Sequence, residues 1–368
     1  MLSLATKMAQ MGNRVDIITL FDNIEDYQFN KIENLNIHHL TNNPNNNKRN
    51  KTIFARVYTR ILKFRADKQH NSDVVKNADK LLNKIRELNV NFDLFISNLI
   101  DTDEVCTQAS LPNLYYCIHG SISEEIKFNN LRNKFVALFY LKRDLTFIKK
   151  LYKNKRLITV SSEMADDLLT LGIMPKSVQT IYNPFDFNYI HQQADFYLPS
   201  EQDYIIHIGR FGPEKRHDIL LKAYKRSGIS NKLLLLGDYN SRYGSKTRQL
   251  SIKLGLQNRV IFKGFNQNPY PYIKYAKALI LSSDSEGLPT VLIEALILKT
   301  PVVSTNCLTG PSEILVDELE EFLSPVGDIN GLAKNIKKVL NYPVEITDKY
   351  ITKFDADKIV QQYLALTK

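Results

Sequence analysis

The chain has 368 residues, of which 43% are hydrophobic, 14 are glycine and 13 are proline, a composition typical of globular proteins that excludes collagen-like, low-complexity and largely disordered chains. The length predicts about two domains, each large enough to bury a core. No stretch has the roughly 18 uninterrupted apolar residues of a spanning helix, and the first residues lack a signal-peptide pattern, so we expect a cytosolic protein. Three distant cysteines, Cys106, Cys117 and Cys307, predict reduced structural thiols and neither a disulfide framework nor a zinc site.

The formal net charge of +10 is unevenly distributed. Two basic segments in the first half, Lys48–Lys68 and Lys127–Arg156, carry +7 and +9, so the rest of the chain carries −6. Both interleave cations with apolar residues at the spacing of a basic amphipathic helix, which favours an anionic membrane surface. An ordinary surface helix with a solvated basic face explains the pattern equally well. Nucleic acid is the least favoured partner because no recognised nucleic-acid-binding motif accompanies the charge.

Helix and strand patterns alternate along the first half of the chain. A helix is expected at residues 2–11, and strands are expected at residues 14–20, 93–97, 114–118 and 157–160. Longer helical stretches separate these strands, and this alternation predicts a parallel, doubly wound sheet.

The pattern starts afresh after a proline-containing turn at residues 182–184, which predicts a domain boundary. The second half is expected to contain strands at residues 204–209, 232–237, 260–264, 278–283 and 301–305. Helices are expected between them at residues 217–227, 243–255, 269–276 and 290–298. The sequence therefore predicts two Rossmann-like domains in tandem.

The sequence SEGLPTVLIEA follows one of these strands and opens a helix, the position at which open α/β sheets bind ligands. Gly287 permits close backbone approach, and the free N–H groups of Thr290 and Val291 favour an anion. Glu286 and Glu294 could accept hydrogen bonds from the hydroxyls of one extended ligand, such as a ribose or a sugar. The alternative is that both glutamates are solvated surface residues.

The sequence GRFGPEK follows the first strand of the second half. Arg210 can fork onto phosphate oxygens and Lys215 can add a point charge, so the two could neutralise a diphosphate without a metal. The alternative is a pair of surface cations that bind Glu214.

Two further positions each have two possible interpretations. His119 ends a predicted strand and is either a ligand-facing or a structural histidine. The loop at residues 309–313 could close over a ligand or form a turn in which Ser312 caps a helix.

The chain contains no G-x-x-x-x-G-K-[ST], G-x-G-x-x-G, H-E-x-x-H or G-x-S-x-G, which removes support for P-loop hydrolysis, dinucleotide redox chemistry, zinc proteolysis and serine hydrolysis.

Four motifs together, HIGRFGPEK, VIFKGF, SSDSEGLPTVLIEAL with its E-x7-E spacing, and GPSEIL, resemble the retaining glycosyltransferases of family 4, also called group 1 glycosyl transferases. The resemblance implies the α/β GT-B fold, with two Rossmann-like domains facing each other across a cleft. It implies an acceptor-binding domain at residues 1–184, a nucleotide-sugar-binding domain at 185–350 and a helix at 351–368 that crosses back to the first domain. Family members usually begin with a strand and a glycine-rich loop, whereas Met1 already falls in the first helix, so we expect that strand and loop to be missing.

The resemblance also implies two groups of site residues. The catalytic group is His119, Glu286, Arg210 and Lys215. The donor-binding group is Arg210, Lys215, Gly264, Phe265, Gly287, Leu288, Thr290, Val291 and Glu294. In this scheme the two cations bind the diphosphate, Glu294 the ribose and the loop of Gly264 the base, while His119 and Glu286 lie near the transferred sugar.

The implied function is that of a retaining hexosyl- or N-acetylhexosaminyltransferase that uses a nucleotide-sugar, UDP-linked donor and needs no metal or other cofactor. The expected acceptor is lipid-linked or a cell-envelope polysaccharide, and the two basic segments would hold the protein at the cytoplasmic face of the membrane. Two alternatives are a sugar-nucleotide 2-epimerase of the same fold and a non-catalytic basic protein that binds RNA or an anionic surface.

Overall fold

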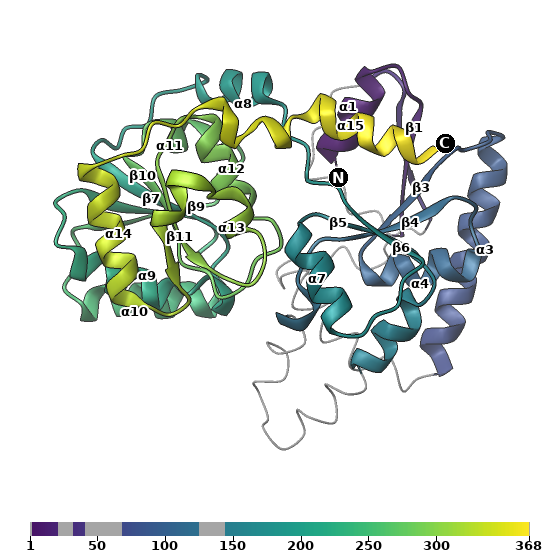
Figure 1. Cartoon of the computed structure of the whole chain (residues 1–368), viewed down its shortest axis with the longest axis horizontal. Coiled ribbons are helices and arrows are strands. Elements are labelled where there is room, and N and C mark those ends of the chain that lie inside the picture. The colour runs from purple at the N-terminus through teal and green to yellow at the C-terminus, as the bar shows by residue number, and fades with distance from the viewer. Residues whose placement is uncertain (1, 21–31, 41–67, 125–143, 368) are drawn as a thin grey trace. The chain divides into compact units, whose positions relative to one another are not determined.

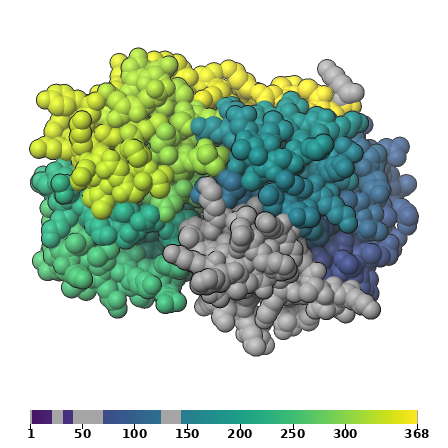
Figure 2. Space-filling view, turned by 60° about the horizontal axis from the view of Figure 1, so that its bottom comes forward, coloured from purple at the N-terminus to yellow at the C-terminus, as the bar shows by residue number. Residues whose placement is uncertain are grey.

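The computed structural model describes residues 2–20, 32–40, 68–124 and 144–367, and the remaining residues are grey in Figures 1 and 2. The chain divides into two compact units. The first comprises Met1–Val160, Ala165–Ile181 and Val360–Lys368, and the second comprises Ser161–Met164 and Tyr182–Ile359. Apart from the short segment Ser161–Met164, the second unit begins at Tyr182, near the expected boundary, and the chain returns to the first unit at Val360, later than the expected residue 351.

The first unit contains two parallel sheets among its described residues. A four-stranded sheet runs in chain order through β3 (Phe95–Asn98), β4 (Leu114–Ile118), β5 (Arg156–Thr159) and β6 (Ser177–Thr180). A two-stranded sheet pairs β1 (Val15–Thr19) with β2 (Leu35–His39). The helices are α1 (Leu2–Gln10), α3 (Lys68–Leu88), α4 (Ile100–Ala109) and α7 (Ser162–Thr170), the last beginning in a segment that clusters with the second unit.

The second unit is built on a six-stranded parallel sheet. Its strands are β7 (Tyr204–Ile208), β8 (Lys232–Leu236), β9 (Val260–Gly264), β10 (Ala278–Leu281), β11 (Val302–Asn306) and β12 (Leu323–Pro325). Their spatial order is β12-β11-β10-β7-β8-β9, so the chain builds outward from β7 first on one side and then on the other. This is the strand order of doubly wound nucleotide-binding sheets, and it confirms the predicted fold class.

Helices cover both faces of this sheet, which explains why its central strands β7, β8 and β10 are rich in apolar residues. They are α8 (Phe187–Ala194), α9 (His217–Ser227), α10 (Arg242–Lys253), α11 (Tyr270–Lys274), α12 (Thr290–Ile297), α13 (Pro311–Ile314) and α14 (Ile329–Asn341). α9 packs against α14, whereas α8, α11 and α12 pack together above the sheet in Figure 1. Ile206, Leu234 and Ile280 are fully buried between these layers.

The last helix, α15 (Ala356–Leu364), contains the point at which the chain returns to the first unit. Beyond that point the Tyr363 hydroxyl lies 3.8 Å from Cys117 Sγ, and the Asn113 amide donates to the Leu366 carbonyl at 3.0 Å. All three cysteines are free, as the sequence predicts.

Candidate functional site

Two loops that carry several of the predicted site residues follow neighbouring strands of the second sheet. β7 and β10 are parallel partners, with Ile206 opposite Leu279, and the direction in which the chain adds strands reverses between them. Connections diverge at such a switch point and leave a crevice outside the carboxyl ends of the strands, where ligands of this architecture bind. The loops at residues 209–216 and 282–289 directly follow these two strands.

Ionic contacts tie these two loops together. Lys215 Nζ donates to Glu286 Oε1 at 2.6 Å, and Ser283 Oγ donates to the same oxygen at 2.5 Å. The Arg216 guanidinium donates to both carboxylate oxygens of Asp284 at 2.9 and 2.7 Å. Arg216 keeps a φ of +46°, a strained left-handed conformation for this residue, at the start of α9. The structure therefore brings Lys215 and Glu286 into direct contact.

Arg210 has a different environment from Lys215. Its Nε donates to Glu214 Oε1 at 2.7 Å, and its side chain is 48% exposed, against 17% for Lys215. The alternative of surface pairing with Glu214 therefore describes Arg210 but not Lys215, which pairs with Glu286. Because Arg210 is half exposed, its guanidinium can exchange a weakly held carboxylate for another anion.

The segment after β11 braces the loop of Glu286. Thr309 Oγ1 donates to the Glu286 carbonyl oxygen at 2.5 Å. Gly310 has a φ of +97°, and a Cβ at this position would lie 2.7 Å from the Gly287 carbonyl oxygen. Only glycine allows this approach, so Gly310 packs directly against the backbone of the loop that carries Glu286. The Glu286 carboxylate points to Lys215.

α12 begins with Thr290 and Val291, and no described side chain caps its first turn. Its first N–H groups and the positive end of its dipole are thus left for a ligand. Glu294 lies one turn further along and makes a hydrogen bond with Tyr270. Burial raises the pKa of Glu294 to about 7 and outweighs the lowering effect of that hydrogen bond.

The loop after β9 presents an aromatic surface. Gly264 has a φ of +82°, and Phe265 is 75% exposed. The rings of Tyr239 and Phe262 lie 5.7 Å apart, and the Arg248 guanidinium lies over both of them. A planar base could stack on such a surface.

His119 belongs to the first unit, whereas the other predicted site residues belong to the second. Its Nε2 lies 2.8 Å from Asn98 Oδ1, and burial lowers the pKa of His119 to about 4, so that the ring is neutral near pH 7. The histidine is therefore hydrogen-bonded and close to the carboxyl end of β4.

The segment at residues 309–313 corrects one expectation about Ser312. The N-cap of α13 is Gly310, without a side-chain hydrogen bond, and Ser312 Oγ donates to Glu163 instead. Glu313 in turn accepts hydrogen bonds from the backbone N–H groups of Ser162 and Glu163 at 2.9 and 2.8 Å. Glu163 thus binds the start of α13, and Glu313 binds the start of α7.

The two basic segments are only partly described by the structure. Lys48–Lys68 lies outside the described residues apart from the start of α3, and Lys127–Arg156 is described from residue 144. In that part, Ile148, Leu151 and Tyr152 are buried, so these apolar residues form core and are not available to a membrane. Among the described helices, none is long and apolar enough to cross a membrane, and no described cluster of acidic, histidine or cysteine side chains could hold a metal.

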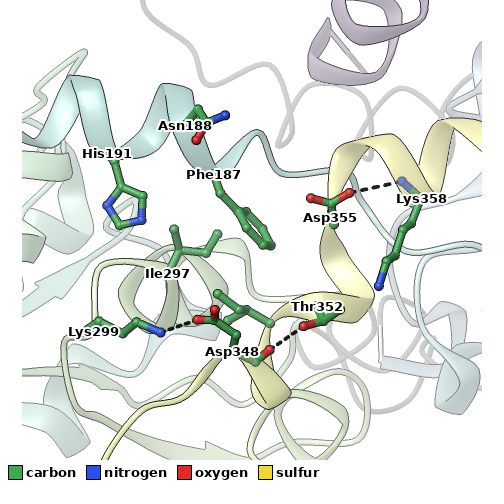
Figure 3. Close-up of a pocket in the computed structure, with 10 residues that line it drawn as sticks. Phe187, Asn188, His191, Ile297, Lys299, Asp348, Thr352, Asp355 and Lys358 are labelled. Carbon is green, nitrogen blue, oxygen red and sulfur yellow. Dashed lines mark hydrogen bonds and ion pairs between the residues drawn. The ribbon is translucent and has the colours of Figure 1, made fainter.

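A pocket of about 440 Å³ opens elsewhere on the second unit, between α8, the end of α12 and the start of α15 (Figure 3). Its charged lining residues are largely satisfied within the protein. Lys299 Nζ donates to Asp348 Oδ1 at 2.6 Å, and Asp355 accepts hydrogen bonds from the backbone N–H groups of Asp357 and Lys358. None of the predicted site residues lines this pocket, so we place the candidate site at the switch point.

A doubly wound sheet with two cations and an uncapped helix start at its switch point is the architecture of α/β proteins that bind phosphorylated nucleotides. The comparison with known families agrees. Residues 1–189 match the family "Glycosyltransferase Family 4", and residues 190–354 match "Glycosyl transferases group 1". The chain therefore belongs to the group 1 glycosyltransferases and has the GT-B fold.

Curated relatives and solved structures are similar over different lengths. Glycosyltransferase MJ1059 of Methanocaldococcus jannaschii is 30% identical over 67% of this chain and 63% of its own length. A Campylobacter jejuni N-acetylgalactosaminyltransferase acting on a diphospho-undecaprenol glycan is 30% identical over 64% of this chain and 60% of its own. The matches thus span less than two thirds of these relatives.

The solved structures match almost the whole chain but at low identity. A glycosyltransferase from Rickettsia africae superposes with a TM-score of 0.69 at 16% identity, covering 100% of this chain and 93% of its own. Anabaena Alr3699/HepE in complex with UDP and glucose gives 0.68 at 19% identity, covering 99% and 94%. These likenesses show the fold.

Sequence reasoning missed several residues that shape the site. Arg216 and Asp284 link the two loops, and Asn98 contacts His119. Asp284 lies within the motif SSDSEGLPTVLIEAL and Arg216 directly follows HIGRFGPEK, so the closeness of these residues to Glu286 and Lys215 in the sequence was an available signal. Asn98 carried no such signal, because its partner His119 lies 21 residues further along the chain, directly after the next strand.

Proposed function

We propose that this chain is a retaining, metal-independent glycosyltransferase that uses a UDP-linked sugar donor. The observation that carries the proposal is that the loop of Arg210 and Lys215 and the loop that leads into α12 follow the neighbouring strands β7 and β10 and are joined by the contact between Lys215 and Glu286. A nucleoside diphosphate gains negative charge as the bond to the sugar breaks. Two cations and a helix N-terminus placed in advance stabilise that charge without a metal ion.

Donor binding requires the two cations to exchange partners. Lys215 now donates to Glu286 and Arg210 to Glu214. A diphosphate offers more negative charge than either carboxylate, so both cations turn to it when it binds. Glu286 is then freed from Lys215 and can accept hydrogen bonds from the hydroxyls of the donor sugar.

Retention follows from attack on the same face of the sugar from which the diphosphate leaves, as the family resemblance implies. In this proposal Lys215 and Arg210 balance the charge of the leaving group and Glu286 orients the sugar, while the neutral ring of His119 binds a substrate hydroxyl. Glu294 binds the ribose and the aromatic surface at Phe265 binds the base.

We propose a lipid-linked or cell-envelope polysaccharide acceptor. The support comes from named relatives: the Campylobacter enzyme acts on an undecaprenol-linked glycan, and Escherichia coli lipopolysaccharide 1,6-galactosyltransferase is 26% identical over 53% of this chain. Attachment to an anionic membrane through Lys48–Lys68 is part of the same proposal. Flotation with anionic vesicles at low salt, lost when Arg56, Arg60 and Lys63 are changed to glutamate, would support it, and no flotation of the wild type would contradict it.

Calorimetric titration with UDP and GDP in the presence of EDTA tests the donor assignment. We expect UDP to bind without a metal, and a panel of UDP-hexoses and UDP-N-acetylhexosamines to reveal release of UDP by the enzyme. Loss of all binding on chelation would contradict the metal-free mechanism. Absence of both binding and turnover, or release of a sugar epimerised at C2, would contradict the proposed function.

A further inference from the structure

We propose that Asn98 is a positioning residue that fixes the orientation and the tautomer of His119, so that Nδ1 of the ring accepts a hydrogen bond from a substrate hydroxyl. The inference deepens the proposed glycosyltransferase function and rests on it for the identity of the ligand. It concerns the first unit alone.

The sheet brings the two residues together at its ligand-binding edge. β3 and β4 are parallel neighbours, with Asn98 opposite Cys117, and His119 directly follows the end of β4. Asn98 Oδ1 lies 2.8 Å from His119 Nε2. Carboxyl ends of parallel strands form the edge at which such sheets bind ligands, so the pair lies where a substrate would arrive.

The backbone that carries Asn98 is held in an unusual conformation. Thr102 Oγ1 donates to the Asn98 carbonyl oxygen at 2.5 Å and to that of Leu99 at 2.8 Å. Leu99 has a φ of +86° and a ψ of 139°, although its side chain is 54% exposed and fills no core position. Such strain persists only where surrounding contacts enforce it, and it concentrates at functional sites. The turn therefore holds Asn98 firmly against His119.

The chemistry of the contact defines the tautomer. An amide oxygen can only accept, so Nε2 of His119 must carry the hydrogen and donate it. The ring is neutral, because burial lowers the pKa of His119 to about 4, and Nδ1 is then a hydrogen-bond acceptor. No residue in the described part of the chain bonds to Nδ1, or to the amide N–H groups of Asn98. The pair thus offers one acceptor and two donors, a set that suits a sugar hydroxyl.

Kinetics on the full chain separate positioning from general stability. With the UDP-sugar that the wild type turns over, Asn98→Ala should lower kcat by about tenfold, the effect of one neutral hydrogen bond, and change the donor KM less. Asn98→Asp places a carboxylate beside the ring, which raises the pKa of His119. Its kcat should fall on the acid side of a new ionisation between about pH 5 and 8 that the wild type lacks. The control Asn83→Asp, exposed on α3 beside Arg86, should keep the wild-type profile.

Nitrogen NMR of the histidine rings tests the tautomer without any activity. The chain has seven histidines, and His119→Gln assigns the signal. We expect the Nε2–H form in the wild type and a mixture of forms in Asn98→Ala. An Nδ1–H form in the wild type, or wild-type kcat and pH profile in both Asn98 variants, would overturn the inference. If no UDP-sugar is turned over, the proposed function fails, and the NMR result alone decides the positioning role.

Discussion

The carboxyl-terminal edges of the two sheets are built from different interactions. In the second unit, salt bridges dominate: Lys215 pairs with Glu286, and Arg216 pairs with Asp284. At the corresponding edge of the first unit, His119 and Asn98 form a contact between two neutral groups. Asp167 accepts hydrogen bonds there from the Ser121 hydroxyl and the Ser123 N–H. Both edges lie where parallel sheets bind ligands, yet the edge of the second unit is held by ion pairs, whereas His119 and Asn98 of the first unit are neutral hydrogen-bonding groups.

This difference fits the roles proposed above for the two groups of residues. A diphosphate needs fixed cations, and cations at an empty site need carboxylates to hold them in place. A sugar or glycan hydroxyl needs only neutral hydrogen-bonding groups, and charge there would cost desolvation energy without a partner. The comparison therefore supports the proposal that the second unit binds the anionic part of the donor and that His119 and Asn98 bind a hydroxyl group.

The largest expected effect on kcat comes from removing a cation at the carboxyl-terminal edge of the sheet in the second unit. Lys215→Ala should lower kcat by about 100- to 1000-fold, because it removes one preorganised group that stabilises the leaving diphosphate, and Arg210→Ala should act in the same range. Steady-state kinetics with the preferred UDP-sugar measures the loss. The control is Lys222→Ala, an exposed lysine of α9 in the same unit.

Folding must be monitored in parallel, since the loss of Lys215 leaves Glu286 without its cation. We expect the melting temperature of the Lys215 variant to change little, because Ser283 still donates to Glu286. A variant that keeps wild-type kcat would contradict the role of Lys215, and a variant that fails to fold would shift the test to Arg210→Ala, which sits at a half-exposed position.

The second unit was the easier of the two to predict from the sequence. Helix 217–227 and strand 260–264 were expected at the observed bounds, because long apolar runs alternate there with amphipathic stretches. In the first unit, β2 and β6 were missed. Their sequences, LNIHH and SVQT, are short and polar, and β6 is largely exposed, so neither gives a hydrophobic signal.

The same contrast applies to the candidate site. Loop residues such as Lys215 and Glu286 were found because their motifs are contiguous, but which carboxylate each cation binds depends on tertiary contacts. Glu214 and Glu286 were both possible partners of Lys215, and only the pairing of β7 with β10 decides for Glu286. The role of Asn98 is likewise a consequence of strand register.

A second prediction concerns two carboxyl groups, one in each unit, whose pKa is raised. Burial raises the pKa of Glu294 in the second unit and of Asp103 in the first to about 7. Since a raised carboxyl pKa means that the folded state holds the proton, both groups contribute stability that is complete below about pH 4 and is lost as the pH rises toward 7. The pH dependence of UDP binding should distinguish the two carboxyl groups, because only Glu294 is proposed to bind the ribose.

Ribose hydroxyls donate to a carboxylate, so UDP should bind the ionised form of Glu294 and release a proton. With a free pKa near 7, the affinity for UDP should be about tenfold weaker at pH 6 than at pH 8. Calorimetry at the two pH values, in buffers of different ionisation enthalpy, measures both the affinity and the proton. Glu294→Gln should remove this dependence, whereas Asp103→Asn should retain it. A pH-independent affinity in the wild type would contradict the ribose assignment.

The smallest expected effect comes from a substitution in the first unit, in the turn that follows β3. Leu99 is exposed and keeps a φ of +86°, a conformation that glycine adopts without strain. Leu99→Gly should raise the free energy of unfolding by about 1 kcal/mol, because the relief of strain exceeds the entropy that glycine adds to the unfolded chain. Urea unfolding measures this change, with Asn89→Gly as the control, since asparagine tolerates its φ of +49° better.

If the strain serves to hold Asn98 against His119, the stabilised variant should also lose part of its kcat. A stabilised variant with unchanged kcat would show that the strain is not needed for that contact, and an unstabilised one would show that the turn is not strained.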